Sequence, residues 1–402
     1  MRGRVLRISY FADIRFPLER ANGVQTMETC HALARRGHEV RLVVRQDSAT
    51  PARDPWEYYG LPRVPALRIE RVSAPDTLPA RRAAYVAHSV WRSLGRSRAD
   101  AILTRDLTIA ALVLRLPSSA RPPVVYESHG FAPAVGEDLP KMLSHAASLS
   151  WAKRRRLEAR ERLVWTRADG YITITAALAR ELEGRFGPRP RLAVVPDGAR
   201  IPDADDVGLR REMATAGPVV GYAGHLYPWK GPDVLVSALA RLPGVRALIV
   251  GGFAGEPDLD RIRALAASAA PGRVTFTGQV EPPRVAGLLR QADVLVLPNT
   301  PGRVSAAYTS PLKLFEYMAS GRPIVASDLP ALREVLRHGE NAVLVEAGSA
   351  EALAAGLSRL LGDAALASRL AKQAREDVRE WTWDRRAGRI ETLLESVTGR
   401  RA

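Results

Sequence analysis

Cysteine is almost missing from this chain, which has one, Cys30, among its 402 residues. A single cysteine excludes an intrachain disulfide and a metal site built on several cysteines, and it fits a reducing cytoplasm. Long apolar runs are missing as well, since none approaches the roughly 18 residues that cross a bilayer, and Met1-Arg2-Gly3 leads directly into an expected strand. We therefore predict a cytoplasmic protein with neither a membrane span nor a classical secretion signal.

Lysine and aromatic residues are scarce, although the formal net charge is +16. Nearly all basic residues are arginines, a bias that is more typical of a GC-rich genome than of a nucleic-acid-binding protein. Aromatic residues make up 6% of the chain, which leaves few rings to stack on bases between the arginines. We expect no nucleic-acid partner, and a polyanion-binding protein stays open as an alternative reading of the charge. The lysines are Lys141, Lys153, Lys230, Lys313 and Lys372.

The length suits two domains, and 46% hydrophobic residues can fill two cores. Short apolar runs alternate with helical patterns through both halves, which predicts an α/β protein with two parallel, doubly wound sheets. The first half offers a helix over 24–36 and strands over 5–10, 39–45, 101–103, 124–127, 171–175 and 192–195. The second half offers strands over 219–223, 247–250, 274–277, 294–297, 324–326 and 343–345.

Two stretches interrupt this alternation. Residues 51–79 are rich in Pro, Arg and Tyr and predict a long irregular excursion where an acceptor could bind. Residues 196–217 contain Pro, Asp and Gly and predict the linker between the domains. We therefore place one domain at residues 1–198 and the other at residues 199–382. The Ala- and Leu-rich stretch from Ala350 onward predicts consecutive helices.

The most informative segment runs from Ser310 to Ala326 and predicts a helix that receives an anion at its first turn. Ser310 suits the N-cap and Pro311 the first helical position, so the free amides of that turn would point at a ligand. A buried strand just before it places this turn at the carboxyl edge of a sheet, where ligands of open α/β sheets bind. Glu316 would be repelled by a phosphate and suits neutral hydroxyl groups such as those of a ribose. The alternative is a capped amphipathic helix with a solvated glutamate.

A second anion site is predicted between residues 217 and 231, where a short strand, a glycine-rich turn and Lys230 precede a helix. The glycines allow close approach of the backbone to a ligand, and Lys230 supplies a positive charge for a phosphate. The spacing lacks the Ser or Thr that follows the lysine of a Walker loop. His225 fits either a phosphate or sugar donor or an ordinary histidine at a strand end.

Together these stretches resemble the retaining glycosyltransferases of family 4. The resemblance covers nearly the whole chain, and the order and spacing of its motifs are more specific than any one of them. The motifs are Asn22-Gly23-Val24 in the first loop, His38-Glu39-Val40, Glu127-Ser128-His129-Gly130, Val195-Pro196-Asp197-Gly198, Gly224 to Gly231, Gly251-Gly252, Ser310 to Ala326, and Trp381-Thr382-Trp383-Asp384.

The resemblance implies the GT-B fold, in which two Rossmann-like domains face each other across a deep cleft and a C-terminal helix, here residues 383–402, returns to the first domain. It implies transfer of a hexosyl group from a nucleotide-diphosphate sugar to a glycan, lipid-linked or small-molecule acceptor, as in cell-surface glycan or glycolipid synthesis. The first domain would hold the acceptor and the second the donor. No separate cofactor is implied.

The resemblance also assigns residues. The catalytic candidates are His129 beside the donor sugar or acceptor, Lys230 on the diphosphate and Glu316 on the ribose. The diphosphate would also meet Gly23 and the turn at Gly224. His225, beside the glycine turn, is a further donor-binding candidate. Gly278, Gln279 and Val280 would face the base, and the remaining candidates are Tyr308, Ser310, Pro311, Leu312 and Lys313. His225 stands where the family often has Arg, and Tyr308 where it often has an acidic residue that touches the donor sugar, which leaves the sugar open.

The chemistry expected of this site is metal-independent transfer with retention of configuration. Lys230, the amides after Ser310 and Lys313 would stabilise the charge of the departing diphosphate. The letters Asp203-Ala204-Asp205 lie in the expected linker, so we predict no metal site there. A sugar-nucleotide epimerase or hydrolase of similar architecture stays open as the alternative enzyme.

One basic helix raises the question of a membrane. Lys153-Arg154-Arg155-Arg156 lies in a long helical stretch that follows apolar residues and Trp151. Such a helix can lie on an anionic membrane. The protein would then act as a peripheral enzyme at the inner face of the membrane. The alternative is a solvated helix that Glu158 and Glu161 partly neutralise.

Overall fold

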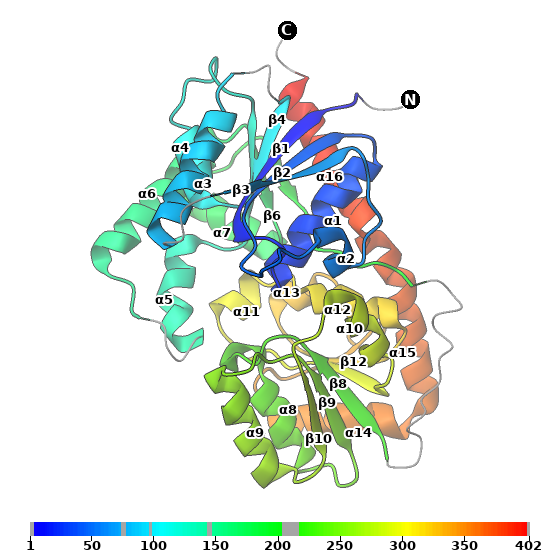
Figure 1. Ribbon diagram of the computed structural model, residues 1–402. Helices are drawn as coiled ribbons and strands as arrows, with labels where there is room; N and C mark the ends of the chain where they lie inside the picture. The colour runs from blue at the N-terminus through cyan, green and yellow to red at the C-terminus, as the bar shows by residue number, and fades with distance from the viewer. Residues whose placement is uncertain (1–3, 74–77, 96–98, 143–146, 203–216, 400–402) are drawn as a thin grey trace. The chain divides into compact units, whose positions relative to one another are not determined.

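The computed structural model describes residues 4–73, 78–95, 99–142, 147–202 and 217–399, which form two compact units (Figure 1). The first unit is built from residues 1–137, 149–196 and 383–402, and the second from residues 138–148 and 197–382. The expected linker therefore lies largely outside the described residues, and so does the stretch Asp203-Ala204-Asp205.

The first unit is a sheet of seven parallel strands in the order β3-β2-β1-β4-β5-β6-β7. The inner strands are buried almost throughout, as both faces of the sheet are covered by helices. Its strands are β1 (Arg7–Arg15), β2 (Glu39–Arg45), β3 (Leu67–Val72), β4 (Ala101–Thr104), β5 (Val124–Ser128), β6 (Gly170–Thr173) and β7 (Leu192–Val194).

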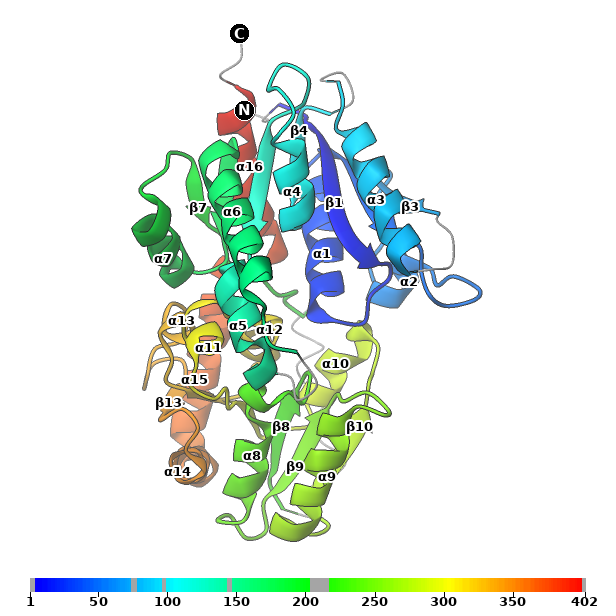
Figure 2. The same cartoon turned by 90° about the vertical axis from the view of Figure 1, so that its left-hand side faces the viewer.

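Helices cover the two faces of this sheet in two groups. The last helix, α16, packs against α1, while α4 lies between α3 and α6 (Figure 2). The helices are α1 (Ala21–Arg35), α2 (Pro55–Tyr59), α3 (Leu78–Arg92), α4 (Leu107–Val113), α6 (Trp151–Arg167), α7 (Ala176–Phe186) and α16 (Trp383–Thr398), and α5 (Ala132–Met142) begins in this unit.

The second unit is a sheet of six parallel strands in the order β10-β9-β8-β11-β12-β13. Its order reverses between β8 and β11, which is the switch point where open α/β sheets bind ligands. The strands are β8 (Val219–Ala223), β9 (Arg246–Val250), β10 (Val274–Gly278), β11 (Val294–Leu297), β12 (Ile324–Ser327) and β13 (Val343–Val345).

Two apolar cores lie on the two faces of this second sheet. One packs β8 and β11 against α8, α9 and α14, and the other packs the sheet against α12 and α15. The elements are η3 (Pro228–Lys230), α8 (Pro232–Leu239), α9 (Pro257–Ala269), α10 (Pro282–Leu289), α11 (Arg303–Ala307), α12 (Leu312–Ser320), α13 (Pro330–Arg333), α14 (Ala350–Gly362), α15 (Ala364–Asp377) and η4 (Val378–Trp381).

The two-sheet α/β fold that the alternation predicts is confirmed, and one segment differs from the prediction. The stretch predicted as an irregular excursion contains the short helix α2 and the edge strand β3. Asp54 caps α2 by accepting hydrogen bonds from the amides of Trp56 and Glu57, and Gly60 ends it in a left-handed conformation with φ of 59°. The sequence did not indicate β3, because this edge strand contains charged residues between its apolar ones and so lacks a continuous apolar run.

Candidate functional site

Three glycines meet at the carboxyl ends of β8, β9 and β10. Gly224 follows β8 with a φ of +128° and Gly251 follows β9 with a φ of +135°, conformations that only glycine adopts readily. A Cβ atom on Gly251 would lie 2.2 Å from the carbonyl oxygen of Gly224, and Gly251 also pairs with Gly278. These loops pack closely because glycine has no side chain. The same property would let a ligand approach their backbones closely.

Lys313 reaches this glycine corner from α12. Its ammonium nitrogen lies 3.8 Å from the centre of the Tyr222 ring and 3.6 Å from the position that a Cβ atom of Gly224 would take. The residue is 7% exposed, and its nitrogen has no hydrogen-bond partner among the described residues. Burial and then the nearby charge of Lys230 hold the pKa of Lys313 well below its usual value, with Glu316 acting in the opposite direction.

Lys230 comes from the other predicted anion loop and carries its charge into the same region. Its nitrogen lies 3.7 Å from the centre of the Trp229 ring, and burial lowers its pKa to about 7. The loop that holds it rests on the loop after β11, because the amide of Thr300 donates to the carbonyl of Trp229 at 3.1 Å. Gly231 makes this contact possible, since a Cβ atom there would overlap the carbonyl oxygen of Pro298.

The two lysines thus lie close together without a direct ion pair to a carboxylate of the described residues. Neither forms an ion pair with any residue that the structure describes, whereas many arginines of the chain do. The charge of Glu316, partly buried in α12, offsets that of Lys313. An arrangement of two partly desolvated cations and closely packed glycine backbones is suited to hold a polyanion such as a diphosphate.

The start of α12 differs from the sequence prediction in its cap. The helix begins at Leu312 with Pro311 as its N-cap, and Ser310 does not cap it. The hydroxyl of Ser310 instead accepts a hydrogen bond from the amide of Asp197 at 3.0 Å. Tyr317 connects α12 to the end of β8, because its hydroxyl accepts a hydrogen bond from the amide of Ala223 at 2.7 Å.

Tyr308 and His225 are held by packing in the same unit. Tyr308 ends α11 and is 4% exposed, so its ring is part of the interior. The imidazole of His225 stacks between two rings, with centroids 4.8 Å from Tyr227 and 5.1 Å from Phe253. Its backbone carbonyl accepts from the hydroxyl of Tyr222 at 2.6 Å.

The segment expected near the base ends β10. Gly278 has a φ of +69°, Gln279 is exposed, and Val280 is partly buried against the core below α12. The hydroxyl of Thr277 donates to the carbonyl of Gly278 at 2.8 Å. The strand end therefore offers mainly backbone groups and one exposed amide side chain.

Gly23 lies in the first turn of α1 in the first unit, not in a loop as the sequence analysis placed it. Its amide donates to the carbonyl of Arg20 at 2.8 Å. A Cβ atom there would lie 2.3 Å from the carbonyl oxygen of Leu18 and 2.4 Å from the hydroxyl of Tyr59. Packing alone therefore requires glycine at this position.

His129 follows β5 in the first unit and lies in a buried polar network. Its Nε2 is 2.7 Å from Oε1 of Glu127, which is also 2.7 Å from Nη2 of Arg386 in α16. Gln25 of α1 donates to the same carboxylate oxygen and accepts from Arg105 at 2.7 Å. Burial and then the charge of Arg105 lower the pKa of His129 to about 4, so the imidazole is neutral at neutral pH.

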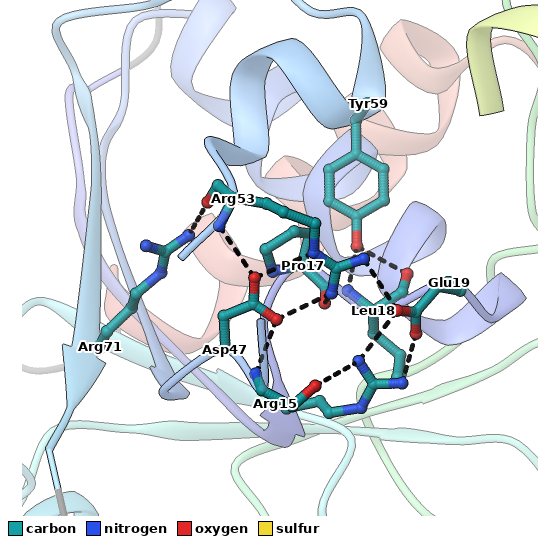
Figure 3. Close-up of polar contacts among 9 residues, drawn as sticks. Arg15, Pro17, Leu18, Glu19, Asp47, Arg53, Tyr59 and Arg71 are labelled. Atoms are coloured by element: carbon teal, nitrogen blue, oxygen red, sulfur yellow. Dashed lines mark hydrogen bonds and ion pairs between the residues drawn. The ribbon is translucent and has the colours of Figure 1, made fainter. Parts of the chain in front are cut away.

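A second network orders the loops after β1 and β2 in the same unit (Figure 3). The guanidinium of Arg53 lies between two carboxylates, 2.8 Å from Oδ1 of Asp47 and 2.8 Å from Oε1 of Glu19. Arg15 binds Glu19 as well and donates to Ser48 at 3.1 Å. Burial opposes ionisation of Asp47, but the hydrogen bonds from Arg53 outweigh it and lower its pKa to about 2. The loops of this sheet edge are thereby fixed in place.

The described residues contain no group of three or more His, Cys, Asp or Glu side chains placed to hold a metal ion. They also contain no helix with the length and apolar character that a membrane span requires.

Several site residues carried no sequence signal of their own. The ring of Tyr222 lies against the ammonium group of Lys313, and the hydroxyl of Tyr317 binds the amide of Ala223. In the sequence, both tyrosines look like ordinary strand and helix residues. Asn299, directly after β11, is fully buried, and its side-chain amide has no hydrogen-bond partner among the described residues. Arg386 is one arginine among many, and only its burial distinguishes it.

Two family descriptions match this chain. "Glycosyl transferases group 1" matches residues 217–363, and "Glycosyl transferase 4-like domain" matches residues 22–198. These ranges coincide with most of the second and the first unit, respectively.

Curated proteins and a solved structure are similar to the chain as well. A D-inositol 3-phosphate glycosyltransferase of Xylanimonas cellulosilytica is 30% identical over 94% of this chain and 92% of that protein. The enzyme of the same name from Nocardia farcinica is 35% identical over 60% of this chain, a region that spans 55% of that protein. The structure of Anabaena Alr3699/HepE in complex with UDP-glucose superposes with a TM-score of 0.71 at 20% identity, covering 97% of this chain and 100% of that one. The last similarity shows the fold, GT-B.

Proposed function

The chain belongs to the group 1 glycosyl transferases with a GT-B fold, and on that premise we propose that it moves a sugar from a nucleotide-diphosphate donor to an acceptor hydroxyl. In this proposal the second unit binds the donor, and the first unit binds the acceptor. The transfer is metal-independent and retains the anomeric configuration.

One observation carries the proposal: Lys230 and Lys313 lie close together beside the glycine corner, and neither forms an ion pair with a described residue. Burial disfavours the charged form of both lysines, so an anion that binds between them would stabilise that form. A departing nucleoside diphosphate has this charge, and groups that are already in place stabilise it without reorganisation. The lysines thereby supply positive charge that a metal would otherwise provide.

Two similar proteins support a proposal for the substrates by analogy. HepE was solved with UDP-glucose, and the full-length relative is named for a polyol phosphate, D-inositol 3-phosphate. We infer a nucleotide-diphosphate hexose as donor and a polyol or glycan hydroxyl as acceptor. Glu316 would bind the ribose and the backbone around Gly278 the base. The ring of Tyr308 is buried, so this residue would not supply the acidic contact to the sugar, and the identity of the sugar stays open.

The experiment is a binding screen followed by a transfer assay. Thermal shifts with UDP, GDP, ADP, CDP and dTDP identify the nucleotide, since a ligand at 100 times its Kd stabilises by about 2.7 kcal/mol. The matching nucleotide sugars are then incubated with inositol phosphates and with glycans, and the anomeric signal of the product is read by NMR. Donor consumption without any acceptor would point to a hydrolase or epimerase instead, and inversion would remove the retaining mechanism.

A matched pair of variants ties the activity to the site. Lys230→Ala is expected to abolish both nucleotide stabilisation and transfer with the fold intact. Lys372→Ala changes an exposed lysine of α15, outside the glycine corner, and is expected to leave both unchanged. Equal behaviour of the two variants would exclude the glycine corner with Lys230 as the donor site.

Peripheral membrane association is a separate proposal and is carried by α6. Trp151 at its start is 68% exposed, and Lys153 to Arg156 are exposed as well. Glu161, expected to neutralise this helix, is instead fully buried and accepts from the amide of Ala132 at 2.9 Å. Of the apolar residues expected beside it, Leu143 lies outside the described residues. Sedimentation with phosphatidylglycerol vesicles, compared with phosphatidylcholine vesicles and with the variant R155Q/R156Q, tests the contact.

A further inference from the structure

Glu127 is the centre of a buried hydrogen-bond network that reaches His129. One of its oxygens accepts from Gln25, His129 and Arg386, the last two at 2.7 Å. The Glu127 side chain is fully buried, and that of Arg386 is 1% exposed. Burial alone would raise the pKa of Glu127, but the charge of Arg386 and the bond from His129 outweigh it, so the carboxyl stays ionised.

An ionised carboxylate can only accept hydrogen bonds, and this determines where the proton of His129 lies. Nε2 must donate to Glu127, which leaves Nδ1 of the neutral ring with a lone pair. The structure gives His129 no other hydrogen-bond partner among the described residues, and 23% of its side chain remains exposed. Nδ1 is therefore the ring nitrogen that can accept a hydrogen bond from a bound molecule.

The charged groups around the ring come from three elements. Glu127 belongs to β5, Arg105 follows β4 and Arg386 belongs to α16, and the two arginines oppose protonation of the ring while Glu127 favours it. Tyr10 and Cys30 also face Glu127, and burial raises the pKa of both, so they add no charge near neutral pH. A ring with a pKa of about 4 is a weak proton acceptor at neutral pH, so it is suited to orient a hydroxyl group and not to deprotonate it.

We propose that Glu127 and Arg386 are positioning residues that hold His129 with its proton on Nε2, so that Nδ1 accepts a hydrogen bond from a hydroxyl of the donor sugar or acceptor. The substrate part of this statement rests on the proposed function. Arg386 also donates to the carbonyls of Val195 and Pro196, at 2.7 and 2.8 Å, and to Thr29 at 3.1 Å. The last helix of the chain thus supplies the cation that keeps Glu127 ionised and in place.

The test begins with nitrogen-15 NMR of histidine-labelled, full-length protein, in which the signals missing from His129→Gln identify His129. The expected spectrum shows the neutral form with the proton on Nε2 from pH 5.5 to 8. A proton on Nδ1, or a ring that titrates near its ordinary pKa, would overturn the proposal. This readout needs no substrate, so it can fail while sugar transfer succeeds, or hold while no nucleotide sugar is consumed.

Variants then separate positioning from mere folding. Arg386→Met and, as a milder change, Arg105→Gln are expected to raise the pKa of His129 by one unit or more and to move the acid limb of kcat/KM upward by the same amount. Glu127→Gln is expected to lower that pKa, and because an amide can donate as well as accept, to populate both tautomers and reduce kcat/KM at least tenfold. Arg92→Gln, which breaks a pair with Glu70 in the same unit, is the control and should shift nothing. A loss of activity that is equal at every pH in Arg105→Gln would leave only a structural role and refute the proposal.

Discussion

Arg386 in the first unit and Lys313 in the second are both long cationic side chains with almost no exposure, 1% and 7%. Arg386 has partners for all three of its nitrogens, namely a carboxylate, a hydroxyl and two backbone carbonyls. Lys313 has the face of the Tyr222 ring and a second lysine nearby. The comparison separates two uses of a buried charge, because a charge with all its partners stabilises the fold, whereas a charge without them is available to a ligand.

The same contrast extends to the surroundings of each cation. The first unit neutralises its arginines internally, as the two carboxylates around Arg53 do at the edge of its sheet (Figure 3). In the second unit, the ammonium nitrogen of Lys313 lies beside the backbone of Gly224 and close to the charge of Lys230. An internal carboxylate there would compete with a diphosphate for the same cations.

Arg386→Met is expected to have the largest effect, which is a loss of stability. Removal of one partner of a buried ion pair typically costs about 3–5 kcal/mol, because the other charge is left uncompensated. We expect that loss in the free energy of unfolding, measured by urea denaturation at pH 7. A loss under about 1 kcal/mol would mean that Glu127 finds another partner and that the network is not structural.

Lys313→Met should do the opposite: it should preserve stability and reduce activity. Methionine keeps the apolar stem and removes an unpaired buried charge, so the free protein should be at least as stable as the unmodified chain. Loss of one preorganised charge contact should reduce kcat by about 10²–10³-fold. Urea denaturation and the transfer assay on the same preparation measure both. Destabilisation together with full activity would show that Lys313 serves the fold.

The pH dependence of donor binding should report on Lys230. Its pKa is about 7 in the free protein, and a bound diphosphate favours the charged form, which raises that pKa. Affinity for the nucleoside diphosphate should therefore be greatest below pH 7 and fall up to tenfold per pH unit above it, with proton uptake on binding at pH 8. Calorimetric titration in buffers of different ionisation enthalpy measures that uptake. An affinity that does not change between pH 7 and 9 would contradict it.

The fold was largely accessible from sequence because its strands are short, buried and apolar. Strands such as β8, β11 and β13 match their predicted bounds, and the edge strand β3 was missed because half of its residues are charged. Predicting the cap of α12 failed because Ser310, a good capping residue, uses its hydroxyl in a tertiary hydrogen bond to Asp197. No local pattern contains that information.

The same division holds for the candidate site. Lys230 and Lys313 could be proposed as candidates because one follows a glycine-rich turn and the other lies at a helix start. Arg386 could not, because its role depends on Glu127, which lies 259 residues away in the sequence. Local motifs therefore indicated the two lysines that have no ion pair better than they indicated the groups that bind one another.

The smallest effect is expected at Glu161. This buried carboxyl group is intermediate between Arg386 and Lys313, because it has some but not all of the partners that a charge needs. It is 0% exposed, it accepts from one backbone amide at 2.9 Å, and burial raises its pKa to about 7. Since the folded-state pKa lies above the unfolded value of about 4.5, the folded protein binds the extra proton, and stability should fall as pH rises from about 5 to 8. Glu161→Gln keeps the acceptor for Ala132 and removes this titration, so it should match the unmodified chain at pH 5 and exceed its stability by about 2–3 kcal/mol at pH 8. Glu158→Gln, one turn away on α6, is the control and should leave the slope unchanged. If Glu161→Gln is instead destabilising at pH 8, the carboxylate has a partner that compensates it, and it belongs with Arg386 among the charges that hold the first unit together.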